Sequence, residues 1–383
     1  MLVEAIAGER LPCAVVDLDA MDRNVDRIKA LLNGKTCRVA SKSIRHVGLL
    51  RRILERGGAD FAGLMCFTAE EAVHLADEGF TDLLVAYPTL QVPALTALAG
   101  RGSIIVDCAQ HVDAASQAGR AAGTPLDVLL ELDVSYRRGP VHLGARRSPI
   151  RGPEAALALA RRIQETEGVN LIGLMGYEGH VAGVPDASPF APAMNPLKRA
   201  MKRIAQPEVA RLRASTVGAL RAEGFDLTVV NGGGTGSLHL TATEDCVTEV
   251  TAGSGFVCSH LFSAFADLDL EPAAWFACEA VRRSDPDMVT CLGGGYVGSG
   301  EPGWDKVPLP VEPPGLKLTP LEATGEVQTP LTGASAVELG QPVFFRHAKA
   351  GELAERFNTY LLLREGRIAG REPTYRGQGQ CFL

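Results

Sequence analysis

A lysine and two glycine-rich segments are the parts of this sequence whose residue types could do chemistry together. Lys42 directly follows an apolar run, and the segments NGGGTGS (231–237) and AGSG (252–255) end two later apolar runs. Backbone N–H groups of glycine-rich loops bind phosphate, as do hydroxyls such as those of Thr235 and Ser237. A lysine amine forms a Schiff base with an aldehyde. The combination indicates a phosphorylated aldehyde as cofactor, and pyridoxal 5′-phosphate (PLP) is such a compound.

Eight apolar runs provide the strands that would bring these residues together. They alternate with amphipathic stretches such as 45–58 and 207–224, several of which end in glycine, as helices commonly do. The runs cover 36–41, 59–65, 82–87, 103–107, 127–133, 171–177, 227–231 and 246–253. This alternation predicts an α/β protein with a (β/α)8 TIM-type barrel, whose active site lies at the C-terminal ends of the strands. A doubly wound sheet is the alternative, but the count of eight and the absence of an early G-x-G-x-x-G motif favour the barrel.

The loops after the seventh and eighth strands of such barrels commonly bind phosphate. The two glycine-rich segments follow the seventh and eighth runs, whereas Lys42 follows the first. Taken separately, the lysine can be a solvated surface cation and each glycine-rich loop can be a tight turn that binds nothing. Their coincidence in these three loops favours PLP binding.

The sequence pattern changes after about residue 267, where turns rich in proline and glycine replace the alternation of apolar runs and amphipathic stretches. Short apolar runs at 341–347 and 359–368 are typical of strands. A further run, 13–19, precedes the first helix and predicts an additional strand. We therefore predict a PLP-binding barrel over 13–266, followed by a β-rich C-terminal domain over 267–383 that includes 1–12.

Composition and charge exclude several classes of protein. The 383 residues carry 38 Lys and Arg against 45 Asp and Glu, a net charge of −7, whereas a nucleic-acid binder would show a basic face. The nine cysteines contain no C-x-x-C pair, so neither a disulfide framework nor a zinc knuckle is indicated. The N-terminal residues do not resemble a signal peptide, and no stretch reads as a membrane span. We expect a cytoplasmic enzyme that binds neither nucleic acid nor membranes.

Two other predicted strand ends carry candidate side chains, each with a structural alternative. Tyr177 ends the sixth run and could stack on a cofactor ring, or simply cover the core. His180 follows it and could act as an acid or base, or be an ordinary loop histidine. After the fifth run, Arg137 or Arg138 could bind a phenolate oxygen, or belong to an exposed basic loop.

The C-terminal part offers two weaker candidates. His347 could ligate a metal ion or act as an acid or base, but Lys349 places an ammonium group two residues away, which repels a cation. Structural capping or substrate contact explains His347 equally well. Tyr375 could bind phosphate or lie in an interface, or it could be an ordinary strand residue.

Together these motifs resemble the alanine-racemase-fold (fold type III) PLP enzymes, in the branch of D-serine dehydratase and D-threonine aldolase. The likeness extends from the opening LPCAVVDLDAMDRNV and the ASKS lysine segment through GLMGYEGH and the glycine-rich loops to the C-terminal domain. It implies that Lys42 forms the Schiff base with PLP, that Tyr177 stacks on the ring, and that the protein is a homodimer with active sites at the interface. The residues implied to bind phosphate are Gly233, Gly234, Thr235, Gly253, Ser254 and, near the position of a phosphate-contacting tyrosine, Tyr375.

Two positions depart from the patterns of that family. Racemases carry an arginine against the pyridine nitrogen where this sequence has Thr251, and a hydroxyl cannot keep that nitrogen unprotonated by charge repulsion. The ring would then be a better electron sink, which favours cleavage of a C–C or C–O bond over exchange of the α-proton. Metal-using aldolases and dehydratases carry His followed two residues later by Cys or Asp, where this sequence has His347 and Lys349. A divalent metal ion is therefore in question.

The resemblance implies a PLP-dependent lyase of amino-acid metabolism. It would act on D-configured β-hydroxy amino acids, either as an aldolase by retro-aldol cleavage or as a dehydratase, with Lys42, His180 and His347 as the catalytic candidates. The first alternative is an amino-acid racemase, which Thr251 disfavours. The second is a non-catalytic PLP-carrier protein. Such carriers tend to be a lone barrel, so the C-terminal extension disfavours this alternative.

Overall fold

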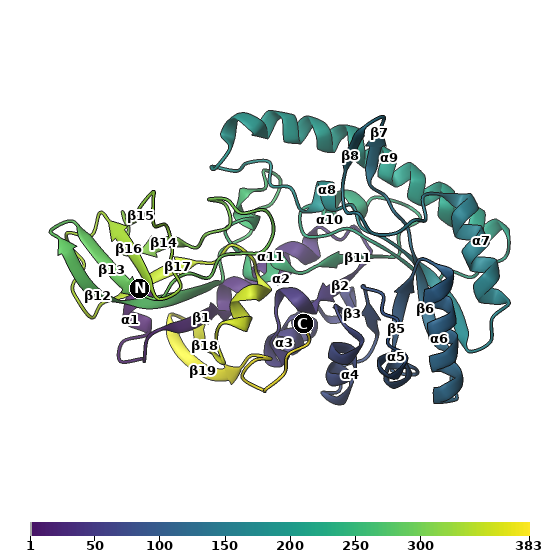
Figure 1. The fold of residues 1–383 in the computed structure, drawn as a ribbon, viewed down its shortest axis with the longest axis horizontal. Coiled ribbons are helices and arrows are strands. Elements are labelled where there is room, and N and C mark those ends of the chain that lie inside the picture. Colours follow the sequence, from purple (N-terminus) through teal and green to yellow (C-terminus); the bar gives the residue numbers. More distant parts are fainter. Residues whose placement is uncertain (1) are drawn as a thin grey trace.

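The computed structural model describes residues 2–383 and shows a barrel with a second, mostly antiparallel sheet beside it (Figure 1). Eight parallel strands close the barrel, because β11 pairs with β10 on one side and with β2 on the other. The strands are β2 (Thr36–Ala40), β3 (Phe61–Cys66), β4 (Leu83–Val85), β5 (Gly102–Val106), β6 (Leu126–Glu131), β9 (Val169–Gly176), β10 (Val229–Gly232) and β11 (Glu249–Ala252). Each of the eight predicted runs overlaps one of these strands, which confirms the predicted barrel and excludes the doubly wound sheet.

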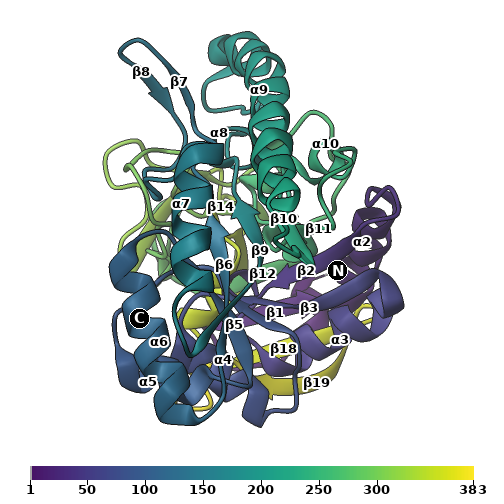
Figure 2. The same cartoon turned by 90° about the vertical axis from the view of Figure 1, so that its right-hand side faces the viewer.

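Helices pack around the outside of the barrel, as Figure 2 shows from the side of α5, α6 and α7. The longer ones are α2 (Leu18–Ala30), α3 (Val47–Gly57), α4 (Ala69–Asp77), α5 (Val92–Leu98), α6 (Ala109–Ala122), α7 (Pro153–Gln164) and α9 (Asn195–Ala222). Their ends follow the sequence signals: Thr68 caps α4 by accepting from the Glu71 N–H at 3.1 Å, and Gly123 ends α6 in the left-handed region. The stretch predicted at 207–224 is the second half of α9.

Four single-turn helices complete the helical part: α1 (Leu2–Ala5), α8 (Gly179–Ala182), α10 (Leu238–Thr241) and α11 (Ser254–Val257). The last three follow β9, β10 and β11, so they lie at the C-terminal ends of barrel strands. Within residues 2–383, none of the helices combines the length and the apolar character that a membrane span requires.

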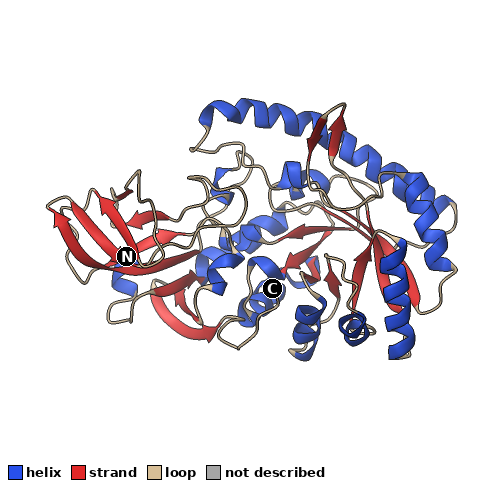
Figure 3. Ribbon diagram, viewed as in Figure 1, coloured by secondary structure: helices blue, strands red, loops and turns tan. Residues whose placement is uncertain are grey.

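Nine strands form the second sheet, seen as the group of red arrows away from the barrel in Figure 3. They are β1 (Cys13–Asp17), β12 (Ala274–Asp285), β13 (Met288–Leu292), β14 (Leu309–Glu312), β15 (Lys317–Leu318), β16 (Gln328–Thr332), β17 (Pro342–Arg346), β18 (Thr359–Arg364) and β19 (Arg367–Pro373). The β-rich C-terminal part is therefore confirmed. The two remaining strands, β7 (Tyr136–Arg138) and β8 (Val141–Leu143), form a separate hairpin near α9 (Figure 1).

The strand predicted at 13–19 forms, but it hydrogen-bonds in the second sheet. β1 runs antiparallel to β12 and parallel to β18, with Val15 opposite both Trp275 and Leu361. The chain thus begins in the second sheet, enters the barrel through α2 and returns after β11. The domain boundary at residue 13 stays a prediction, and the pairing of β1 favours a boundary after this strand.

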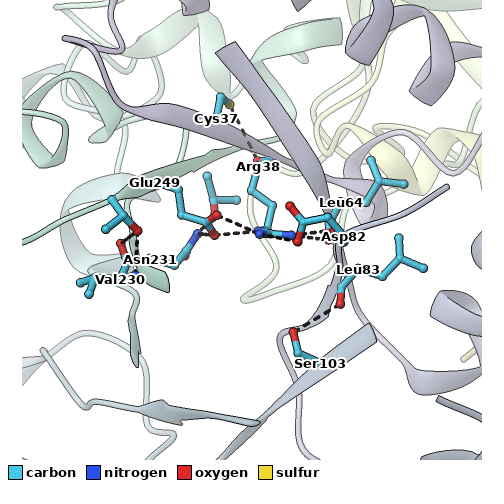
Figure 4. A network of polar contacts seen from close by, with 11 residues as sticks. Cys37, Arg38, Leu64, Asp82, Leu83, Ser103, Val230, Asn231 and Glu249 are labelled. Atoms are coloured by element: carbon cyan, nitrogen blue, oxygen red, sulfur yellow. Dashed lines mark hydrogen bonds and ion pairs between the residues drawn. The ribbon is translucent and has the colours of Figure 1, made fainter. Parts of the chain in front are cut away.

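A buried ion pair lies inside the barrel at the seam between β2 and β11 (Figure 4). Arg38 of β2 is 2% exposed, and its Nε and Nη2 donate to the two carboxylate oxygens of Glu249 at 2.6 and 2.8 Å. Arg38 also donates to the backbone oxygen of Asp82 at 2.7 Å, while Glu249 accepts from the Asn231 amide of β10 at 2.8 Å. This network ties β2, β10 and β11 together. Since Lys42 and both glycine-rich loops follow these strands, the network positions the candidate residues.

We expect Arg38→Ala to destabilise the protein strongly, because the Glu249 carboxylate stays buried without its ionic partner. Removing one partner of a buried pair costs about 3–5 kcal/mol. Urea denaturation monitored by circular dichroism measures the loss. Arg23→Ala is the matched control, because its ion pair with Glu271 is solvent-exposed and such pairs contribute about 0–1 kcal/mol. Equal losses in the two variants would contradict this account.

Candidate active site

Lys42 projects from a single 3-10 turn, Ser41–Ser43, that follows β2. Its Nζ donates to the hydroxyl of Tyr87 at 2.8 Å. The cavity around it is lined by Tyr177, by Gly233, Gly234 and Thr235 after β10, and by Thr251, Gly253 and Ser254 at the end of β11. The structure therefore brings together the lysine, the predicted stacking tyrosine and both predicted phosphate loops, although their sequence positions span more than half of the chain.

The two glycine-rich loops are hydrogen-bonded to each other and leave no room for side chains. The Thr235 hydroxyl accepts from the N–H groups of Gly253 (3.3 Å) and Gly255 (3.1 Å), which links the loop after β10 to the loop after β11. A Cβ on Gly253 would lie 2.6 Å from Ser43 Oγ and 2.8 Å from Ala40 Cβ. Gly233 has a φ of +83°, in the region that favours glycine. Bare backbone thus faces the cavity, which suits close approach of a phosphate.

A buried carboxylate anchors the first of these loops from behind. Glu178 is fully buried and accepts from the Gly233 N–H at 3.2 Å and from the Ser237 hydroxyl at 2.8 Å. Arg213 of α9, equally buried, donates to the same carboxylate at 2.9 Å and also pairs with Glu244. Because Glu178 directly follows Tyr177, one short segment positions both the predicted stacking ring and the predicted phosphate loop. The sequence offered no signal for Glu178 or Arg213, whose contact depends on the tertiary fold.

Thr251 stands on the strand that carries the second loop and lines the same cavity. Its hydroxyl accepts from the Asn231 amide at 2.9 Å, and the same amide also binds Glu249. The position predicted to face the pyridine nitrogen therefore carries a neutral hydroxyl with a hydrogen-bonded connection to the Arg38 network, and it carries no cation.

Two residues that the sequence reasoning missed complete the cavity wall, Tyr87 and Arg147. The Arg147 guanidinium lies 5.1 Å from the ring centres of both Tyr87 and Tyr177. Burial alone raises the pKa of the Tyr87 phenol, but the charges of Lys42 and Arg147 outweigh it and lower that pKa below its usual value. Burial raises the pKa of Tyr177 to about 12. Tyr87 ends the third predicted run, so the strand-end rule that selected Tyr177 could also have found it.

Arg137 and Arg138, the arginines considered from the sequence, lie elsewhere. Both belong to β7, and neither lines the cavity with Lys42. Arg137 pairs with Asp133 at 2.7 Å, and Arg138 is exposed. The loop after the fifth predicted strand does place an arginine in the cavity, but this residue is Arg147, nine residues beyond Arg138. The reason is that the β7–β8 hairpin projects from the barrel before the chain returns to it.

Three other predicted site residues are also outside this cavity. Tyr375 is buried and donates its hydroxyl to Glu71 at 3.1 Å. The rings of His180 and His347 are buried, and none of their nitrogens has a hydrogen-bond partner among residues 2–383. Burial lowers the pKa of both imidazoles, to about 3 for His347, where Arg346 adds to the effect. These three side chains therefore do not line the cavity around Lys42, and their predicted roles in the site stay predictions.

The residues around His347 do not fit a divalent metal ion. The carboxylate of Glu352 accepts from the backbone N–H and the hydroxyl of Ser299, and that of Glu355 pairs with Arg45 at 2.7 Å. Among residues 2–383, the group of three candidate ligand side chains within reach of one ion is Asp107, Cys108 and His111, at the start of α6, and it does not include His347. Lys349 and Arg346 add positive charge close to the imidazole. The predicted metal role of His347 therefore finds no ligand set here.

The cavity around Lys42 does fit PLP, and the glycine cradle provides a test. Replacing Gly253 by alanine should raise the dissociation constant of PLP at least tenfold, about 1.4 kcal/mol, because its Cβ would collide with Ala40 and Ser43. Titration of the cofactor-free protein with PLP, followed by absorbance, measures this constant. Gly218→Ala is the matched control, since a Cβ at Gly218 meets nothing within 4 Å. Unchanged affinity in the Gly253 variant would show that phosphate does not bind at this loop.

Comparisons with known proteins agree with this geometry. The D-threonine aldolase of Arthrobacter sp is 27% identical over 348 residues, which are 88% of this chain and 84% of the relative. The D-threo-3-hydroxyaspartate dehydratase of Delftia sp. (strain HT23) is 28% identical over 254 residues, covering 63% of this chain and 60% of the relative. The structure of D-threonine aldolase from Filomicrobium marinum superposes with a TM-score of 0.83 at 21% identity, covering 97% of this chain and 96% of that one.

The family model named "Alanine racemase, N-terminal domain" matches residues 16–257, which hold all eight strands of the barrel, Lys42 and both glycine-rich loops. This match covers well over half of the chain. The protein therefore belongs to the family of the alanine racemase N-terminal domain.

Proposed function

We propose that this protein is a PLP-dependent lyase that acts on D-configured β-hydroxy amino acids, as an aldolase or a dehydratase. The observation that carries the proposal is the single cavity in which Lys42 meets two glycine-rich loops and the neutral Thr251. The two curated relatives described above support the substrate class, because their names state activity on D-threonine and on D-threo-3-hydroxyaspartate.

Different residues of the cavity would bind different parts of PLP. Lys42 would bind the aldehyde carbon through Nζ, and the two glycine-rich loops, with Thr235 and Ser254, would bind the phosphate. Thr251 would face the ring nitrogen, and Tyr177 would stack on the ring. When bound, PLP supplies a sink for the electrons that are released as a bond at the substrate Cα breaks.

Lys42 and Tyr87 can hold and move the proton that the reaction needs. Their Nζ and Oη atoms are 2.8 Å apart, within the range for direct proton transfer. The lowered pKa of Tyr87 brings its hydroxyl closer to the operating range of an acid. In a dehydration, Lys42 would take the proton from Cα while a neighbouring acid assists the leaving hydroxyl. In an aldol cleavage, a base would instead take the proton of the β-hydroxyl.

Amino-acid racemisation is the second candidate, and the cavity disfavours it. A neutral hydroxyl at position 251 does not keep the ring nitrogen unprotonated, so the ring withdraws electrons strongly, which suits C–C or C–O cleavage. The non-catalytic PLP carrier is disfavoured by the nine-stranded second sheet, whose segment 349–352 lines a cavity that also contains Lys42. A homodimer with shared active sites and a cytoplasmic location both stay predictions from the sequence.

The test uses the purified protein supplied with PLP and offered D-threonine or D-threo-3-hydroxyaspartate. Aldolase activity would release glycine together with acetaldehyde or glyoxylate, whereas dehydratase activity would release ammonia together with 2-oxobutanoate or oxaloacetate. We expect Lys42→Ala to lose the visible absorbance of the bound cofactor and at least 1,000-fold of the turnover rate, since the amine is the point of covalent attachment. Lys317→Ala, at an exposed position of β15, is the control.

Two results would contradict the proposed lyase function. A colourless wild-type protein that gains no absorbance with PLP would overturn the proposal. Racemisation of alanine without release of aldehyde, ammonia or keto acid would replace it with the racemase alternative.

A further inference from the structure

Lys349 brings a second amine to the site of Lys42 from the other domain. It lies between β17 and the 3-10 helix Gly351–Glu355, and it lines a cavity of about 460 Å³ that also contains Lys42 and Tyr177. The backbone here is in direct contact with the Lys42 turn, because a Cβ on Gly351 would collide with the Lys42 carbonyl. This outer cavity adjoins the one described above, since both are lined by Lys42, Ser43, Tyr177, Ser254 and Phe262.

The stem of Lys349 is packed, while its ammonium group has no partner. A Cβ on Gly298 would lie only 2.9 Å from Lys349 Cγ, so the stem crosses a glycine that leaves room for it. Lys349 is half-buried, and across residues 2–383 no hydrogen bond or ion pair to its side chain is found. The Lys349 ammonium is therefore free to bind an anionic group of a ligand in this cavity.

The neighbouring charged groups of the outer cavity are already paired. Lys306 donates to Asp305, and Arg45 pairs with Glu355 at 2.7 Å. The carboxylate of Glu352, the residue after Gly351, accepts from the N–H and hydroxyl of Ser299. The lining holds four cationic side chains, Lys42, Arg45, Lys306 and Lys349, against the carboxylates of Asp305 and Glu352. Within residues 2–383, Lys42 and Lys349 are the cations of this lining that form no ion pair.

We infer that Lys349 is a specificity-determining residue that binds a second carboxylate, on the side chain of the substrate. This inference rests on the proposed function and narrows its substrate class to acidic D-β-hydroxy amino acids, of which D-threo-3-hydroxyaspartate is an example. An ammonium–carboxylate contact is a charge-assisted hydrogen bond, stronger than a neutral one. The methyl group of threonine, in contrast, would leave the cation unpaired. The residues around His347 do not form a metal site, so a bound metal ion would not bind the substrate carboxylate in place of Lys349.

The experiment compares two ligands that have the same shape but differ in charge and lack a β-hydroxyl, so that neither can be cleaved as a β-hydroxy amino acid. The PLP-loaded protein is titrated with D-aspartate and D-asparagine, and the dissociation constants are measured from the absorbance of the cofactor. We expect the wild type to bind D-aspartate at least tenfold more tightly. Lys349→Met, which keeps the length of the side chain and removes the charge, should abolish this preference, and Lys349→Arg should retain most of it.

The control is Lys317→Met, because Lys317 lies exposed on β15 of the second sheet and lines none of these cavities. It should keep the wild-type preference. Circular dichroism and cofactor absorbance show whether the Lys349 variants fold and bind PLP. Equal binding of the two ligands by the wild type would overturn the inference, and so would an unchanged preference in Lys349→Met.

A parallel turnover assay separates this inference from the proposed function. If the wild type prefers D-aspartate through Lys349 but converts neither D-threonine nor D-threo-3-hydroxyaspartate, the carboxylate site stands and the proposed lyase activity falls. If it converts both substrates at equal kcat/KM and Lys349→Met changes neither value nor the binding preference, the lyase stands and the carboxylate site falls.

Discussion

The closure of the barrel between β11 and β2 is the interaction on which the rest of the site depends. These strands are more than 200 residues apart in the sequence, and their pairing sets Thr251 opposite Arg38 and Ala252 opposite Val39. One residue beyond Ala252, Gly253 then lies against Ser43, the residue that follows Lys42. The Arg38–Glu249 ion pair inside the barrel stabilises this seam at the level of the side chains. Lys42 and the second glycine-rich loop thus line one cavity because the barrel closes in this register.

A buried ion pair between Glu178 and Arg213 supports the loop after β10. Glu178 and Arg213 are both fully inaccessible, and desolvating such a pair is costly unless hydrogen bonds and ion pairs compensate for it. Here the carboxylate accepts from a backbone N–H, from hydroxyls and from the guanidinium. The cost is therefore offset by bonds that hold the loop after β10 in one conformation. A preformed loop loses little conformational entropy when an anion binds, which strengthens binding.

The second sheet contributes to the site as well as to the fold. Strand β1 places the start of the chain between β12 and β18, so the sheet is built from both ends of the sequence. The segment after β17 then meets the Lys42 turn through Gly351 and presents Lys349 to the outer cavity. Chemistry near the cofactor is governed by the barrel, whereas the charge at the cavity mouth comes from this other domain.

The sequence by itself determined the barrel, the lysine and the two glycine-rich loops that line the same cavity. Each of these depends on local information, since apolar runs define strands and glycine-rich turns and Lys42 lie directly at their ends. Distant pairing decided the rest: that β1 joins the second sheet, that Arg147 and not Arg138 reaches Tyr87, and that Glu178 and Arg213 anchor a loop. It also decided that His180 and His347 are buried and do not line the cavity around Lys42, although both follow predicted strands. The physical reason is that a strand end specifies an edge of the barrel, while the direction of a side chain within a long loop depends on what packs against it from elsewhere in the chain.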